Sequence, residues 1–332
     1  MNKFIFTCGD INGIGPEIII KALNRIAIKS KDHFTILCPG SVFYNAAKIV
    51  KPRFKFSDYR KDIDYLRQNI LLVDIGNYKQ TVGKPTIASG EAAFESIQRA
   101  MALSDLCYAE AVITAPISKT AIKMAGHNYP GHTEIFAEGF GAKNFVMMFL
   151  SDKMNAALAT IHEPVKKVPG LITKEAISGR LDVIISTLKR DLNITSPNIA
   201  VLGLNPHAGE NGLIGKEEID TIIPIIKDKK YSSYLSGPFS PDAFFANQMY
   251  KKFDLVFGMY HDQVLIPFKL MNFGAGVNFT AGLPIVRTSP DHGTAFDIAG
   301  KGIADESSMV SAFFYAKKIL NNRKSNGLGK RK

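Results

Sequence analysis

Five of the seven histidines in this 332-residue chain lie in short polar segments that follow apolar runs. They are His132, His162, His207, His261 and His292. In α/β proteins, ligands bind in the loops that follow the carboxyl ends of strands, so this placement favours a shared site. Three neutral imidazoles that meet form an open metal site with room for water or substrate. Imidazole favours zinc or cobalt, whereas magnesium would need carboxylates such as Asp242.

The convergence of these histidines is a hypothesis, because they are far apart in sequence and no H-x-x-x-H pair occurs. A single histidine is more often a structural or surface residue than a ligand. His33 and His127 lack the loop context of the other five, and we assign them that role.

A second group of residues is suited to bind an anion. Asn278 and Arg287 are expected to follow buried strands, and Lys269 adds a point charge. A guanidinium binds phosphate or carboxylate through two parallel hydrogen bonds. The alternative for each residue is a surface ion pair. The glycine-rich segment 9–16 matches neither G-x-G-x-x-G nor G-x-x-x-x-G-K-[ST], which favours a tight turn between strand and helix.

Alternating apolar runs and amphipathic segments predict the elements that position these residues. Strands are expected at residues 3–7, 34–38, 70–75, 111–114, 199–204, 255–259 and 277–280, with a hairpin formed by 145–150 and 156–160. Helices are expected at 16–27, from a cap at Ser89 to about 110, from Thr173 onward, and at 305–320. The pattern predicts an α/β fold with a mainly parallel, helix-covered sheet. We treat residues 1–320 as one two-lobed unit and 321–332 as a basic, disordered tail.

The composition is that of a globular protein, with 46% hydrophobic and 21% charged residues. Because no apolar run is long enough for a membrane helix or a signal-peptide core, we expect a cytoplasmic protein that does not bind membranes. The three cysteines, Cys8, Cys38 and Cys107, form no C-x-x-C pair, which favours reduced thiols. The net charge of +11 attracts anions such as phosphorylated metabolites. Without the spacing of a nucleic-acid-binding motif, this charge does not indicate a nucleic-acid partner.

Six motifs that follow one another in order carry a resemblance to a known family. They are GDINGIGPE at 9–17, TAPISK at 114–119, YPGHTE at 129–134, LNPHAGE at 204–210, MYHDQ at 259–263 and RTSPDHGTA at 287–295. Together they resemble the 4-hydroxythreonine-4-phosphate dehydrogenases of pyridoxal phosphate synthesis, over essentially the whole chain up to about Leu320. Two departures are visible: Asp10-Ile11-Asn12 replaces the usual Asp-Pro-Ala, and Gln263-Val264 replaces the usual Gln-Gly.

The resemblance implies an isocitrate/isopropylmalate dehydrogenase type of fold, with an active cleft between two α/β lobes. It also implies a homodimer whose active site lies at the subunit interface, with metal ligands from both subunits. The implied metal ligands are His162, His207 and His261. The implied substrate contacts are His132, Thr133, Lys269, Asn278 and Arg287.

Residues 292–302 also resemble the adenosine-binding loop of isopropylmalate dehydrogenases. The implied cofactor contacts are His292, Gly293, Thr294, Ala295 and Asp297. A carboxylate at Asp297 would meet the ribose hydroxyls and favour NAD, with NADP as the alternative cofactor.

The resemblance implies a metal-assisted, NAD-dependent oxidation of 4-phosphohydroxy-L-threonine. Zinc is the expected metal, with cobalt or magnesium as alternatives. The β-keto acid product would lose carbon dioxide and give 3-amino-2-oxopropyl phosphate. Two residues, His132 and Asp242, are candidates for the catalytic base. The nearest alternative is a dehydrogenase of 4-phospho-D-threonate or D-erythronate phosphate. A phosphate acyltransferase would need neither the histidines nor Asp297.

Overall fold

The computed structural model describes residues 1–59, 69–272 and 274–327. The chain divides into two compact units that are not contiguous in sequence. The first unit comprises Met1–Ala142 and Leu283–Leu320, and the second comprises Lys143–Gly282 and Asn321–Lys332. Within the described residues, no helix is long and apolar enough to cross a membrane.

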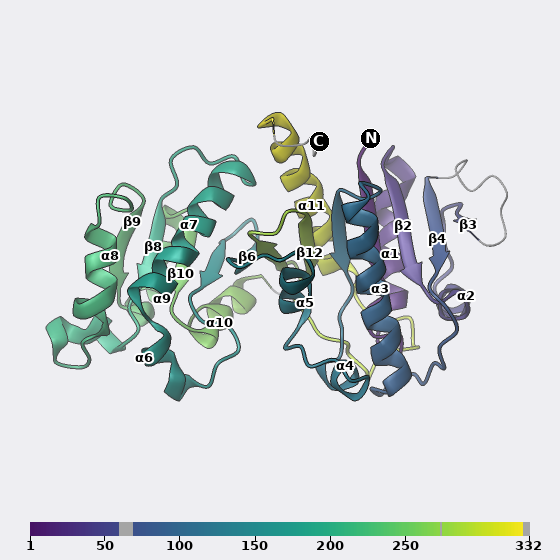
Figure 1. Cartoon of the computed structure of the whole chain (residues 1–332), viewed down its shortest axis with the longest axis horizontal. Helices are drawn as coiled ribbons and strands as arrows, with labels where there is room; N and C mark the ends of the chain where they lie inside the picture. The colour runs from purple at the N-terminus through teal and green to yellow at the C-terminus, as the bar shows by residue number, and fades with distance from the viewer. Residues whose placement is uncertain (60–68, 273, 328–332) are drawn as a thin grey trace. The chain divides into compact units, whose positions relative to one another are not determined.

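The sheet of the first unit has the strand order β3-β4-β2-β1-β5-β12, and the pairs are parallel (Figure 1). Its strands are β1 (Lys3–Thr7), β2 (His33–Cys38), β3 (Ser57–Asp58), β4 (Ile70–Asp74), β5 (Ala111–Thr114) and β12 (Val286–Pro290). All residues of β5 and β12 are buried, as expected for strands with both faces covered. The carboxyl ends of these strands therefore share one edge of the sheet.

Helices cover this sheet, and residues close in sequence stabilise the ends of several of them. They are α1 (Gly15–Ile26), α2 (Gly40–Ile49), α3 (Ile87–Asp105), α4 (Lys119–Met124), α5 (His132–Gly139) and α11 (Ser307–Ser325), with a 3-10 turn at Ala27–Lys29. Pro16 lies in the first turn of α1 as predicted. The cap of α3 is Thr86 rather than Ser89, because the two residues exchange hydrogen bonds of 3.1 Å in a capping box.

The sheet of the second unit has the order β11-β6-β7-β10-β8-β9. Its strands are β6 (Val146–Leu150), β7 (Ala156–Leu158), β8 (Ile199–Leu202), β9 (Leu235–Phe239), β10 (Leu255–Gly258) and β11 (Val277–Ala281). The predicted hairpin is confirmed, because β6 pairs antiparallel with β7. From β7 through β10 and β8 to β9 the pairing is parallel. The predicted α/β class with a mainly parallel sheet is confirmed.

The helical segments of the second unit are α6 (Val168–Leu171), α7 (Lys174–Arg190), α8 (Ile223–Lys227), α9 (Pro241–Ala246), α10 (His261–Met271), 3-10 turns at Val165–Lys167, Pro206–Gly212 and Met249–Lys252, and a π-helical turn at Glu218–Ile222. The side chain of Thr173 caps α7 by accepting a hydrogen bond from the Ala176 amide. In Figure 1, α7 and α10 lie on the second unit, where α7 packs on β6 and β11, and α10 on β7 and β10. Met147, Phe149 and Phe268 belong to its apolar core.

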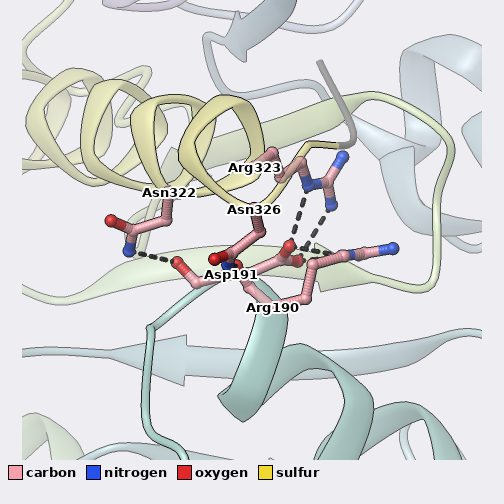
Figure 2. A network of polar contacts seen from close by, with 5 residues as sticks. All are labelled: Arg190, Asp191, Asn322, Arg323 and Asn326. Carbon is pink, nitrogen blue, oxygen red and sulfur yellow. Dashed lines mark hydrogen bonds and ion pairs between the residues drawn. The ribbon is translucent and has the colours of Figure 1, made fainter. Parts of the chain in front are cut away.

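The last helix extends further than the sequence predicts, because α11 continues to Ser325. The proposed disordered tail from residue 321 is therefore corrected, and residues 328–332 of that segment lie outside the described residues. Figure 2 shows why the end of α11 is ordered. The buried carboxylate of Asp191 accepts paired hydrogen bonds from Arg190 and from Arg323, at 2.6–2.9 Å. Asn322 and Asn326 add amide bonds to the carbonyls of Asp191 and Arg190.

Candidate functional site

The three histidines that the resemblance implies as metal ligands follow three adjacent strands of the second unit. His162, His261 and His207 follow β7, β10 and β8 by a few residues each. These strands are neighbours and run parallel, so their carboxyl ends meet at one edge of the sheet. The structure thus brings the histidine-bearing loops to the place where parallel sheets bind ligands.

The loops after β7 and β10 continue side by side beyond the strands. The amide of Ala159 donates to the carbonyl of Gly258 at 2.8 Å, and Thr160 donates through its amide and hydroxyl to the carbonyl of Met259. The rings of His162 and His261 therefore lie close together, with centroids 6.0 Å apart. Nδ1 of His261 is 2.6 Å from the carboxylate of Asp262, which leaves Nε2 available to a ligand.

The loop after β8 is tied to the loop after β10 by the buried side chain of Gln263. Its amide oxygen accepts from the Met259 amide at 2.7 Å, and its Nε2 donates to the Gly203 carbonyl at 2.6 Å. His207 lies further along this loop and is exposed. Gln263 belongs to the motif at 259–263, but the sequence predicts no role for it, because a bridge to a segment 60 positions away is not visible in sequence.

Asp242 follows β9, the strand next to β8, and lies in the first turn of α9. The Ser240 hydroxyl donates to its carboxylate, and this bond, the Ala243 amide and the charge of His207 lower the pKa of Asp242. The exposed carboxylate is thus ionised at neutral pH and lies near His207. A carboxylate of low pKa is a weak proton acceptor.

The donors present fit a divalent metal, although the described residues of one chain do not bring three of them together. Among residues 1–59, 69–272 and 274–327, no group of three His, Cys, Asp or Glu side chains is close enough to hold an ion. Two imidazoles that share a zinc ion place their ring centres ~5–6 Å apart, which matches His162 and His261. His207 is not brought into this pair. The donor chemistry suits zinc, and a second chain is the source that the resemblance implies for the missing ligand.

In the first unit, Arg287 is the centre of a buried polar cluster. It lies within β12 rather than after it, and 1% of its surface is exposed. Its guanidinium donates to the Thr114 hydroxyl at 2.6 Å and lies 5.9 Å from the Phe136 ring centre. Burial lowers the pKa of Arg287 to about 9, and the nearby charge of Glu134 opposes this shift. Arg287 thus remains a cation at neutral pH, in surroundings where an anion would stabilise its charge.

His132 and Thr133 begin α5, the helix that also carries Glu134. Burial, and then the charge of Arg287, hold the pKa of His132 well below its usual range. The imidazole is therefore neutral at pH 7. Its Nε2 is buried and has no hydrogen-bond partner within the described part of the chain. Thr133 is buried beside it.

The loop after β12 contains the implied cofactor contacts, and the start of α1 holds it. The Thr294 carbonyl accepts from the Ile14 amide at 3.0 Å. The buried carboxylate of Glu17 accepts from the amides of Gly300 and Gly302. Glu17 belongs to the motif at 9–17, but the sequence predicts no role for it, because its partners are more than 280 positions away.

The residues of this loop fit a dinucleotide. The carboxylate of Asp297 is exposed, as a contact to ribose hydroxyls requires. Nε2 of His292 is buried without a hydrogen-bond partner in the described residues, so a polar group of a ligand would satisfy it. The backbone has a positive φ of 43° at Ala295, and in the same turn Gly293 is exposed and Thr294 is half-buried.

The remaining predicted substrate contacts lie in the second unit. Lys269 is exposed in the last turn of α10. Asn278 lies inside β11 rather than after a strand, and its Oδ1 is buried without a partner among the described residues. Of the departures from the family pattern, Val264 packs in the apolar core. Asn12 is buried and binds the Thr81 amide, the Lys84 carbonyl and the Thr86 hydroxyl.

Comparison with known proteins identifies the family of the chain. Residues 30–316 match the family described as pyridoxal phosphate biosynthetic protein PdxA. A 4-hydroxythreonine-4-phosphate dehydrogenase of Zymomonas mobilis is 40% identical over 98% of both chains. One of Aquifex aeolicus is 40% identical over 97% of this chain and 99% of its own. The crystal structure of the Klebsiella pneumoniae 4-hydroxythreonine-4-phosphate dehydrogenase has a TM-score of 0.81 and 34% identity, and covers 96% of this chain and 99% of its own. The chain therefore belongs to the PdxA family of pyridoxal phosphate biosynthetic proteins.

Proposed function

We propose that this protein is a metal-assisted, NAD-dependent dehydrogenase of 4-phosphohydroxy-L-threonine whose β-keto acid product loses carbon dioxide to give 3-amino-2-oxopropyl phosphate. The main observation behind the proposal is that three histidine-bearing loops follow neighbouring strands. His162, His261 and His207 follow three adjacent parallel strands. The names of the relatives support the substrate.

Arg287 is the residue best suited to bind an anionic group of the substrate. A buried cation is costly, and a phosphate or carboxylate beside it would offset that cost through paired hydrogen bonds. Lys269 would add a second positive charge, and Asn278 would donate from its amide. Thr133 would contribute a hydroxyl hydrogen bond.

His132 is the proposed proton acceptor, since its imidazole is neutral at pH 7 and borders Arg287. The charge of Arg287 lowers the basicity of this imidazole in the free enzyme. An anionic substrate on Arg287 would weaken that effect and raise the basicity of His132 when the proton must be taken. Asp242, with its lowered pKa, is better suited to stay ionised.

A divalent cation held by His162, His207 and His261 would lower the pKa of the substrate alcohol and polarise the later ketone. NAD along residues 292–297 would accept the hydride. Glu17 fixes the loop that binds it, and Asp297 favours NAD because a carboxylate repels the 2′-phosphate of NADP.

Exposed apolar side chains favour a homodimer that completes the site. Each histidine is followed by one: Val165, three residues after His162, is 72% exposed, Leu213, six residues after His207, is 84% exposed, and Leu270, nine residues after His261 in the last turn of α10, is 80% exposed. Such side chains beside a polar site are typical of an interface. A second copy of the chain would cover them and supply the missing metal ligand.

The experiment is an assay of NADH formation by the full chain with 4-phosphohydroxy-L-threonine, with and without zinc. 4-Phospho-D-threonate and D-erythronate phosphate are assayed beside it, and NADP replaces NAD in a parallel series. We expect the highest kcat/KM with the L-threonine derivative and NAD. A higher value with either sugar-acid phosphate would assign the alternative function.

His207→Ala should remove bound metal and reduce turnover at least 100-fold, because zinc would lose one of its imidazole ligands. Metal content is measured on the same preparation as turnover. His33→Ala, which changes a histidine outside the site, is the control and should retain both. Normal turnover in a metal-free His207→Ala enzyme would refute the metal-assisted reaction.

A further inference from the structure

The turn that carries His207 has an unusual backbone. His207, Ala208, Gly209, Glu210 and Asn211 all have positive φ values, between 42° and 79°. Only one of the five is a glycine. A left-handed conformation costs an ordinary L-residue ~1 kcal/mol or more, so four such residues within a run of five need support from the surrounding structure.

The carboxylate of Glu218 provides that support from beneath the turn. The side chain is 1% exposed. Its Oε1 accepts from the backbone amides of Leu204 and Asn205 at 2.7 and 2.8 Å. Its Oε2 accepts from Nδ2 of Asn205 at 2.9 Å. Both oxygens therefore fix the residues that lead into the turn.

The turn closes directly over this carboxylate. A Cβ at Gly209 would lie 2.6 Å from Oε2 of Glu218, and one at Gly203 would lie 3.1 Å from Oε1. The two glycines therefore allow the close approach. The Ala208 amide then donates to the Asn205 carbonyl at 3.1 Å, which links the fixed segment to His207. Glu218 also begins a π-helical turn, a feature that is frequent at functional sites.

We propose that Glu218 is a positioning residue that holds the left-handed turn in place and thereby sets the affinity of His207 for a divalent metal. This inference rests on the proposed function, because it takes His207 as a ligand. Glu218 does not touch the metal. It acts by accepting N–H hydrogen bonds through both of its oxygens, which an amide cannot do.

The test is the zinc affinity of the full chain, measured by competition with a chromophoric chelator, together with the visible spectrum of the cobalt form. Glu218→Gln should weaken zinc binding 10- to 100-fold, the usual effect of removing a group that orients a ligand. It should also change the cobalt spectrum. Affinity for NADH should stay within about three-fold, because that loop belongs to the first unit.

Asp220→Asn, on the same helical turn, is the matched control, because it removes an equal charge at an exposed position and leaves the three bonds of Glu218 in place. It should change zinc affinity less than about three-fold. A Glu218→Gln protein that binds zinc as tightly as the wild type, while His207→Ala does not, would overturn the inference. Equal zinc binding by wild type and His207→Ala would instead overturn the proposed metal site.

Gly209→Ala tests the same inference if Glu218→Gln does not fold. It keeps Glu218 but places a methyl group against its carboxylate at a φ of 79°. Gly170→Ala is its control, because a Cβ there meets nothing within 4 Å. Weaker zinc binding in Gly209→Ala alone supports the role of Glu218. Equal binding in both variants contradicts it.

Discussion

Buried carboxylates of this protein differ in what they do, and their partners explain the difference. Glu17 and Glu218 accept two or more N–H bonds each and hold loops. Asp10, at the end of β1, accepts from the Asn12 amide at 2.9 Å and the Ser89 hydroxyl at 3.1 Å. Burial raises the pKa of Asp10 to about 6, although both bonds oppose the shift. The ionised form of Asp10 is thus disfavoured in the folded state.

Asp10→Asn should therefore change how stability depends on pH. Because the folded pKa lies above the unfolded value of 3.8, the stabilisation from Asp10 is complete below that value and is lost as the pH rises through 6. Relative to wild type, the variant should gain about 1–2 kcal/mol between pH 5 and pH 8. Urea unfolding at both pH values measures this change. A parallel pH dependence of the two proteins would contradict it, and Asp220→Asn at an exposed position is the control.

The sequence could identify the candidate metal ligands and catalytic side chains. It could not identify the residues that fix the loops carrying them. The histidines were recognisable as a set, because five of the seven lie in segments that follow apolar runs. Glu17, Gln263 and Glu218 each contact backbone amides or carbonyls, so their roles depend on which segments the fold brings together. Asn12 was recognisable only as a departure from the family, and its contacts with residues 81–86 come from tertiary structure.

At the scale of elements, the end of α11 is held to the end of α7 by one carboxylate (Figure 2). Burial alone would raise the pKa of Asp191, but the bonds from Arg323 and Arg190 outweigh it and lower the pKa. The contribution of Asp191 is therefore present at neutral pH and is lost as the pH falls through its lowered pKa in the folded state. The sequence showed only a run of basic residues here, which is why the helix end was predicted as a disordered tail.

Asp191→Asn should destabilise the second unit by about 3 kcal/mol, because two guanidinium groups would lose a buried counter-charge. Urea unfolding measures the loss, and hydrogen exchange should show reduced protection near Arg323. Asp182→Asn on the same helix is the control. Its ion pair with Lys230 is exposed, so its removal should cost less than about 1 kcal/mol. Equal losses in the two variants would contradict the role of Asp191.

At the scale of the whole molecule, the proposed second copy is open to a direct test. Leu270→Glu places a charge on an exposed apolar position of α10 and should shift the protein from dimer to monomer, with loss of turnover. Light scattering after gel filtration measures the mass. Leu106→Glu, at an equally apolar exposed position of the first unit, should leave the mass unchanged. A Leu270→Glu protein that remains dimeric would exclude this face as the interface.

The class of fold could be predicted from the alternation of strands and helices, but its division into units could not. The chain leaves the first unit after Ala142 and returns to it at Leu283. These two positions lie in short connections, from α5 to β6 and from β11 to β12, which resemble the other turns of the chain and therefore do not indicate a boundary between units. The hairpin of β6 and β7 was recognisable because its two apolar runs are separated by only a few polar residues.

Because two separate segments of the chain form the first unit, this unit cannot finish folding until late in synthesis on the ribosome. The strand β12, which lies beside β5, and the helix α11, whose Phe313 packs on Phe4 and Phe34, are among the last segments to emerge. The aromatic side chains near the N-terminus therefore stay uncovered until nearly the whole polypeptide has been synthesised. During that interval the nascent chain presents an apolar sheet face, and such a surface favours aggregation until α11 covers it.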